Sequence, residues 1–128
     1  MKKVLAVVAV VFAVGVYAES AFGQCERRCH RAAREGQAAC DEQLQQHLRQ
    51  CAAECGDNRE CLEACRARAE HAHQECLENV RCNFGCCVGV CEGLEHCRRE
   101  CAGDRRCYRR CKQGVLERGQ RCRRECAA

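Results

Sequence analysis

The sequence predicts an all-α fold. We expect an elongated, antiparallel three-helix (up-down-up) bundle, stapled by disulfides, in which two helical hairpins share a long central helix. Three observations lead to this prediction. The 18 cysteines fall into sets whose members are 4 or 11 residues apart. Because 11 residues are close to three whole helical turns, each set forms one stripe on a helix. The chain also contains no proline that would interrupt a helix, and a short Gly-Asp turn occurs twice between the cysteine sets.

The two turns predict which cysteines face each other. Antiparallel helices rise at the same rate, so the residue numbers of a facing pair add up to a constant. Around Gly56-Asp57-Asn58 the constant is 116, and around Ala102-Gly103-Asp104 it is 208. Every cysteine then has one partner, and the facing Cα atoms of packed helices come within disulfide range. The nine predicted disulfides are Cys25–Cys91, Cys29–Cys87, Cys40–Cys76, Cys51–Cys65, Cys55–Cys61, Cys82–Cys126, Cys86–Cys122, Cys97–Cys111 and Cys101–Cys107.

Local signals place the helix ends near the two turns. Gly56 suits the left-handed position after a helix end. The next helix has two candidate caps, Asn58 and Asp57, and Asp57 would form a capping box with Glu60. Gly36 is a weak point of the first helix. The turn and its flanking cysteines recur 46 residues later, which indicates two hairpins of the same design. The expected helices are residues 25–55, 58–101 and 104–126.

Three glycines in residues 85–93 leave the middle of the central helix open to two interpretations. Each glycine costs a helix about 1 kcal/mol, which favours a break. Alternatively, their spacing of four residues forms a stripe that lets a neighbouring helix approach closely. In that case Val115 and Leu116, which lie opposite Gly93 and Glu92, would fill the groove.

The first 23 residues have the features of a secretory signal peptide. Two lysines precede a short apolar run, residues 4–16, and small-residue cleavage patterns end at Ala18 and Gly23. We expect cleavage after Gly23, which leaves residues 24–128 as a single cysteine-rich helical domain. The apolar run is too short for a good membrane span. Export into the periplasm, to the cell surface or out of the cell is the setting in which so many cysteines form disulfides.

Composition argues against an enzyme. Residues 24–128 contain no Ser or Thr, so Tyr108 carries the only hydroxyl nucleophile. The pairing leaves no free thiol, and the Cys-x₂-Cys spacing of zinc and thioredoxin-like sites is absent. We therefore expect no catalytic residue, no metal and no cofactor. Phe84 and Tyr108 are too few aromatic residues for base stacking, so no nucleic-acid partner is expected.

The apolar core is expected to be small. Residues 24–128 contain only twelve large apolar side chains other than Ala and Cys. Ordering a chain costs about 1–2 kcal/mol per residue, which so few side chains cannot offset. Cross-links must therefore supply the missing stability.

Charge is segregated along the chain. Residues 24–80 carry a net charge of −3 (8 basic, 11 acidic), whereas residues 81–128 carry +6 (12 basic, 6 acidic). A basic helix of this kind can meet a polyanion or an anionic membrane surface. The candidate anion-binding residues are Arg105, Arg106, Arg109, Arg110, Lys112, Arg118, Arg121, Arg123 and Arg124.

Two resemblances concern the Cys-x₃-Cys pairs. The segment Cys107-x₃-Cys111-x₁₀-Cys122-x₃-Cys126 resembles the plant α-hairpinin defence peptides, which are disulfide-stapled helical hairpins. That resemblance implies a different pairing, Cys107 with Cys126 and Cys111 with Cys122. The Cys-x₃-Cys motifs also resemble those of bacterial copper-storage four-helix bundles, which implies a core of free thiols that binds copper(I).

Three functions follow from these features. The first is a secreted, non-enzymatic structural or binding protein whose basic C-terminal helix contacts anionic surfaces. The second is a copper(I)-binding or storage bundle. The third is a cationic antimicrobial or toxin-like protein, although a membrane-active helix needs an apolar face that the basic helix does not offer. The sequence leaves the oligomeric state open.

Overall fold

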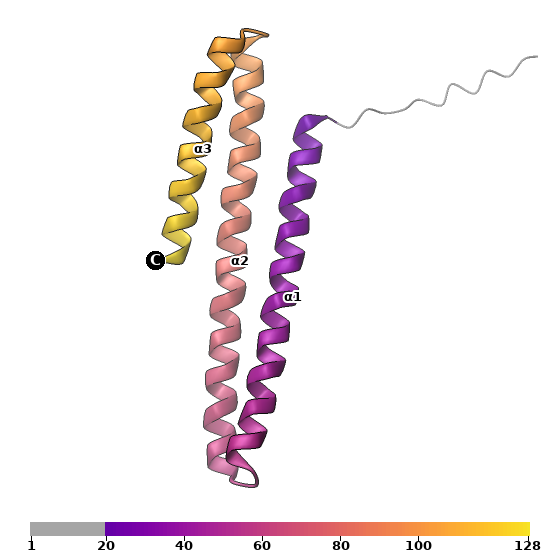
Figure 1. Ribbon diagram of the computed structural model, residues 1–128, viewed down its shortest axis with the longest axis vertical. Helices are drawn as coiled ribbons and strands as arrows, with labels where there is room; N and C mark the ends of the chain where they lie inside the picture. Colours follow the sequence, from indigo (N-terminus) through magenta and orange to yellow (C-terminus); the bar gives the residue numbers. More distant parts are fainter. Residues whose placement is uncertain (1–19) are drawn as a thin grey trace, which may run out of the picture.

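A computed structural model describes residues 20–128, and this part of the chain forms three long α-helices and no strands (Figure 1). They are α1 (Ala21–Cys55), α2 (Arg59–Cys101) and α3 (Arg105–Ala127). Tight turns join them, so the chain runs up, down and up, with α2 between its two neighbours. The predicted all-α fold of two hairpins that share a central helix is confirmed. Residues 1–19, which include most of the predicted signal peptide, lie outside the described part.

The helix ends at the two turns agree with the sequence, and one of the two candidate caps of α2 forms. The helices α1 and α2 end at Cys55 and Cys101, as expected, and Gly56 and Gly103 take positive φ angles of 54° and 89° in the turns. Asn58, rather than Asp57, caps α2 by accepting a hydrogen bond from the Cys61 N–H at 3.1 Å.

The first helix starts four residues before the expected position at residue 25, because Ser20 caps it. The Ser20 hydroxyl accepts a hydrogen bond from the Gly23 N–H at 3.1 Å. The cap shows that residues 21–24 continue the first turn of the helix when they are present.

Nine disulfides tie both outer helices to α2, and no cysteine is free. They join the same nine pairs that the two constants predict. Their Cα–Cα distances lie between 5.4 and 5.8 Å, within the range that a disulfide spans. The pairing implied by the α-hairpinin resemblance does not form: Cys107 is bonded to Cys101, and Cys126 to Cys82.

The buried interior consists mostly of these cross-links. Seven of the nine buried apolar residues in the described part are half-cystines, and the other two are Ala69 and Val115. No polar or charged side chain is buried there. The interior is therefore a row of sulfur atoms with little aliphatic packing, as the shortage of large apolar residues predicts.

Glycines let the helices approach closely at three points where a valine of a neighbouring helix lies against the glycine backbone. A Cβ atom at Gly36 would lie 2.9 Å from a methyl group of Val80, and one at Gly93 would lie 2.9 Å from both methyl groups of Val115. Gly119 meets Val90 in the same way. Gly36 is therefore a packing contact rather than only a weak point.

The glycine-rich segment 85–93 stays helical within α2. Only Gly93 uses the predicted groove, because nothing lies within 4 Å of a Cβ atom at Gly85 or Gly89. Val115 fills the groove and is 4 % exposed, as predicted, but the prediction for Leu116 is wrong, since it is 40 % exposed. One residue corresponds to a rotation of about 100° on a helix, so the neighbour of a buried residue points elsewhere.

The outer helices α1 and α3 both pack on α2 and do not pack on each other. No Cα atom of α1 lies within 8 Å of a Cα atom of α3. The helix α3 runs beside only one half of α2, and the first part of α1 lies beside that same half (Figure 1). One half of the rod therefore has three helices and the other half has two.

Removing an isolated disulfide should cost more stability than removing a terminal one. In the Cys40→Ala/Cys76→Ala variant, the nearest remaining bridge on either side is 11 residues away. We expect the free energy of unfolding to fall by about 3 kcal/mol, because the unfolded chain is no longer constrained by this bridge. The matched Cys55→Ala/Cys61→Ala variant opens a loop of only 6 residues beside Cys51–Cys65, so its loss should be about 2 kcal/mol. Guanidinium unfolding followed by circular dichroism measures both free energies of unfolding, and the opposite order would contradict this arrangement of disulfides.

Alanine at Gly93 should destabilise the protein, whereas alanine at Gly89 should stabilise it. Both changes favour the helix by about 1 kcal/mol, but only Gly93→Ala forces a methyl group against Val115, at a typical cost of about 1–3 kcal/mol. Thermal melting of the oxidised protein compares the two. Equal changes in melting temperature in the two variants would show that α3 does not pack closely against Gly93.

Candidate functional site

The nine predicted anion-binding residues are all exposed on α3. Its cysteines, with Val115 and Gly119, form the face that packs on α2. The helix contains nine basic and two acidic residues. Its net charge is thus +7 (9 basic, 2 acidic), and the basic side chains lie on its exposed surface.

Four of these arginines form one stripe on the far side of α3, and we call them the outer arginines. They are separated by 4, 11 and 3 residues, which places them within an arc of roughly 60° and away from the cysteine stripe. Glu117 lies in the same arc and accepts a hydrogen bond from the Gln113 side chain at 3.2 Å. The outer arginines are Arg106, Arg110, Arg121 and Arg124.

Three further basic residues surround a hollow of about 470 Å³ at the α2–α3 turn. Arg105, Arg109 and Lys112 line it together with Tyr108, and none of the three has an ion pair within residues 20–128. Asp104, also at this hollow, is the N-cap of α3 and accepts hydrogen bonds from two backbone N–H groups at 2.9 and 3.1 Å. The N-terminus of α3 adds a partial positive charge, so the hollow suits an anion.

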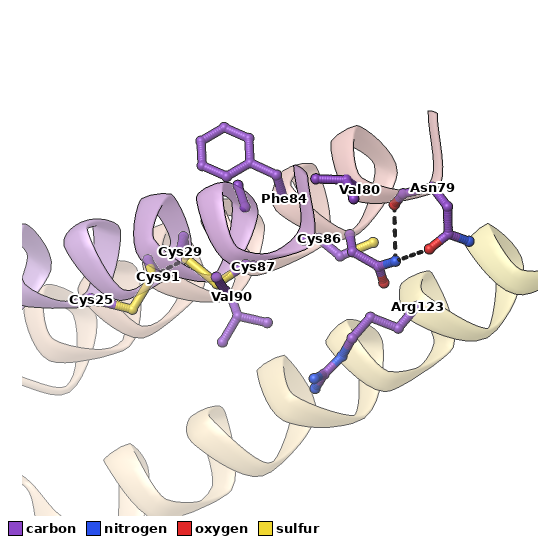
Figure 2. Close-up of a pocket in the computed structure, with 14 residues that line it drawn as sticks. Cys25, Cys29, Asn79, Val80, Phe84, Cys86, Cys87, Val90, Cys91 and Arg123 are labelled. Carbon is purple, nitrogen blue, oxygen red and sulfur yellow. Dashed lines mark hydrogen bonds between the residues drawn. A yellow bond between two sulfur atoms is a disulfide. The ribbon is translucent and has the colours of Figure 1, made fainter. Parts of the chain in front are cut away.

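The last two of the nine point to other places. Arg118 borders a shallow hollow over the glycines of α2. Arg123 lies at the edge of a cleft between the three helices (Figure 2). The basic residues are therefore spread around the sides of α3 that α2 does not cover.

The fold increases the charge separation seen along the sequence. Ser20 and the first part of α1 lie along the same half of α2 as α3, so the half of the rod that contains α3 consists of residues 20–35 and 81–128 (Figure 1). This basic half carries +8 (16 basic, 8 acidic), whereas the acidic half, residues 36–80, carries −5 (4 basic, 9 acidic). The rod is therefore a large electric dipole along its length.

Neighbouring disulfides bring sulfur atoms together at two places in α2. The Cys29 and Cys91 sulfurs, from adjacent bridges, are 3.6 Å apart, as are those of Cys86 and Cys126. With Cys87 and Cys82 they form two groups of three sulfurs, each within 4.8 Å. In disulfides these atoms are poor metal ligands, because the thiolate is the form that binds a metal. Reduction would turn each group into a cluster of soft ligands.

Two histidines contact a residue of another helix, which the sequence did not indicate, and a third, His71, places its Nε2 atom 3.1 Å from a Glu75 carboxylate oxygen within α2. The His73 Nε2 atom lies 2.8 Å from an Asp41 carboxylate oxygen and thereby links α2 to α1. The His30 ring lies against Phe84, with ring centroids 4.9 Å apart. The residue numbers 41 and 73 add up to 114, close to the constant of 116 for that hairpin, so the register rule could have found the first contact.

No protein family, curated protein or solved structure matches this chain. None of the described helices is long and apolar enough to cross a membrane.

Proposed function

We propose that the protein is a secreted, non-enzymatic rod that binds anionic surfaces through the basic half of its length. The observation that carries this proposal is the exposure of all nine basic side chains of α3 on a framework that cross-links hold rigid. A surface of one sign attracts an oppositely charged partner over about a Debye length, roughly 8 Å at physiological salt. When α3 lies against an anionic surface, its basic side chains are closer to that surface than one Debye length.

The charge dipole gives the bound rod a direction. The basic half is attracted to an anionic surface, and the acidic half is repelled by it. The same rod then presents residues 36–80, and the turn at Gly56, away from the surface. Cross-links at both ends of each hairpin keep this geometry fixed, which suits a structural or display role.

Neutralising the outer arginines should weaken binding to anionic vesicles far more than neutralising four other arginines. Each basic residue near an anionic membrane contributes about 1 kcal/mol, so we expect Arg106→Gln/Arg110→Gln/Arg121→Gln/Arg124→Gln to lower the affinity at least about a hundredfold. Co-sedimentation with vesicles of equal parts phosphatidylglycerol and phosphatidylcholine measures this, and high salt should abolish binding.

The matched control removes the four arginines of the acidic half, Arg49, Arg59, Arg66 and Arg68, all of them exposed. It has the same net charge as the test variant and should retain affinity within a few-fold. Equal losses in both variants would show that net charge alone matters, and unchanged binding of the test variant would refute the role of α3. Release of a vesicle-trapped dye would instead favour the antimicrobial or toxin-like alternative.

Copper(I) storage is the second candidate, and the two sulfur groups favour it specifically. It requires free thiols, so the redox state separates the two functions. We expect the exported protein to have an intact mass lower by two hydrogens for each of nine bridges, and to bind no copper(I) in an anaerobic titration. A higher mass, with copper(I) bound and helicity retained after reduction, would favour the storage function.

A further inference from the structure

We propose that the cleft between α1, α2 and α3 binds a single-chain anionic amphiphile, such as a free fatty acid, with its carboxylate at Arg123. The cleft has a volume of about 380 Å³, within the usual range for small-ligand sites. It lies where α1 and α3 flank the same part of α2 (Figure 2). This inference shares Arg123 with the basic set of α3, but it does not rest on the proposed surface binding, and none of the outer arginines lines the cleft.

The walls of the cleft are apolar. Small side chains of α1 (Ala32 and Ala33) line it together with Val80, Phe84 and Val90 of α2. Figure 2 shows Val90 pointing from α2 toward α3, with the disulfides of α1 beside it. Such a lining matches an alkyl chain, because each buried methylene group contributes favourably to binding.

Among the polar residues that line the cleft, Arg123 is the charged one, and it is available to bind an anion. The Asn79 side-chain N–H donates to the Cys126 carbonyl at 3.2 Å, and the Asn83 side-chain N–H donates to the Asn79 carbonyl and side-chain oxygen at 2.9 and 2.7 Å. Both side-chain N–H groups of Asn83 and one of those of Asn79 are therefore occupied. Arg123, by contrast, is exposed and has no ion pair with any residue in the range 20–128. The complement of an apolar cleft with one free guanidinium is an apolar tail with one negative charge.

Cross-links keep the cleft open without a ligand. Cys87 and Cys91 hold α1, and Cys82 and Cys86 hold α3, on two stripes of α2 roughly 100° apart. The outer helices cannot move together to bury the apolar walls, because each is bonded to α2 twice in this region. The site is therefore preorganised, which lowers the entropic cost of binding.

Calorimetric titration of the oxidised protein with sodium dodecanoate tests the proposal. We expect one dodecanoate per chain, and at least about tenfold weaker binding of dodecyltrimethylammonium, which has the same tail with the opposite charge. Arg123→Gln should weaken dodecanoate binding about tenfold through the loss of a charge-assisted hydrogen bond. Arg34→Gln is the matched control, since Arg34 is an exposed arginine of α1 outside the cleft, and should have no effect.

Ala32→Leu provides a second, steric test, because a larger side chain fills the cleft without changing charge. It should reduce dodecanoate binding while the disulfide mass and the helicity remain unchanged. Equal affinity for the two amphiphiles, or equal effects of Arg123→Gln and Arg34→Gln, would overturn the proposal. So would a dimer in sedimentation that Ala32→Leu dissociates in the absence of dodecanoate binding, since a second copy of the chain would then occupy the cleft.

Discussion

The structure depends on the register that two tight turns impose on three antiparallel helices. Once a turn is fixed, each residue of one helix has a single neighbour at its level on the other, and every disulfide follows from that register. The cross-links in turn replace an apolar core, since seven of the nine buried apolar residues in the described part are half-cystines. A chain stabilised in this way needs few large apolar residues. Its surface is therefore free to hold many charges, including the unbalanced set on α3.

The same register accounts for the division of the rod into a basic and an acidic half. The cysteines of α2 switch from the α1 stripe to the α3 stripe near Cys86 and Cys87, where the two sets of bridges overlap. The overlap places the start of α1 beside α3 and adds its arginines to the basic end. It also creates the cleft, because two helices held on neighbouring stripes of a third cannot touch each other. Charge separation and cleft are thus two consequences of one arrangement of cysteines.

The sequence could predict the features that follow from the register of the helices. It could not predict those that depend on the direction and packing of individual side chains. The helices, the pairing and the contact of Val115 with Gly93 follow from counting residues across a turn. The burial of Leu116 did not follow, because the count gives a residue's level but not its direction around the helix. The cleft was missed for a related reason. Two stripes about 100° apart were recognisable, but the free space between them depends on small residues such as Ala32 and on the hydrogen bonds that occupy Asn79.

The redox state links this architecture to the proposed functions. With so little aliphatic packing, the reduced chain lacks the interactions that would hold three long helices together. Isolated helices in water are marginal even when their sequences favour them, so the bundle requires some bond between its sulfurs. Disulfides supply that bond in an oxidising compartment. In a reducing one a metal would have to supply it, and copper(I) would then be a folding ligand as well as a cargo. The proposed rod and the copper(I) alternative therefore use the same register of cysteines, and they differ in the compartment that each requires.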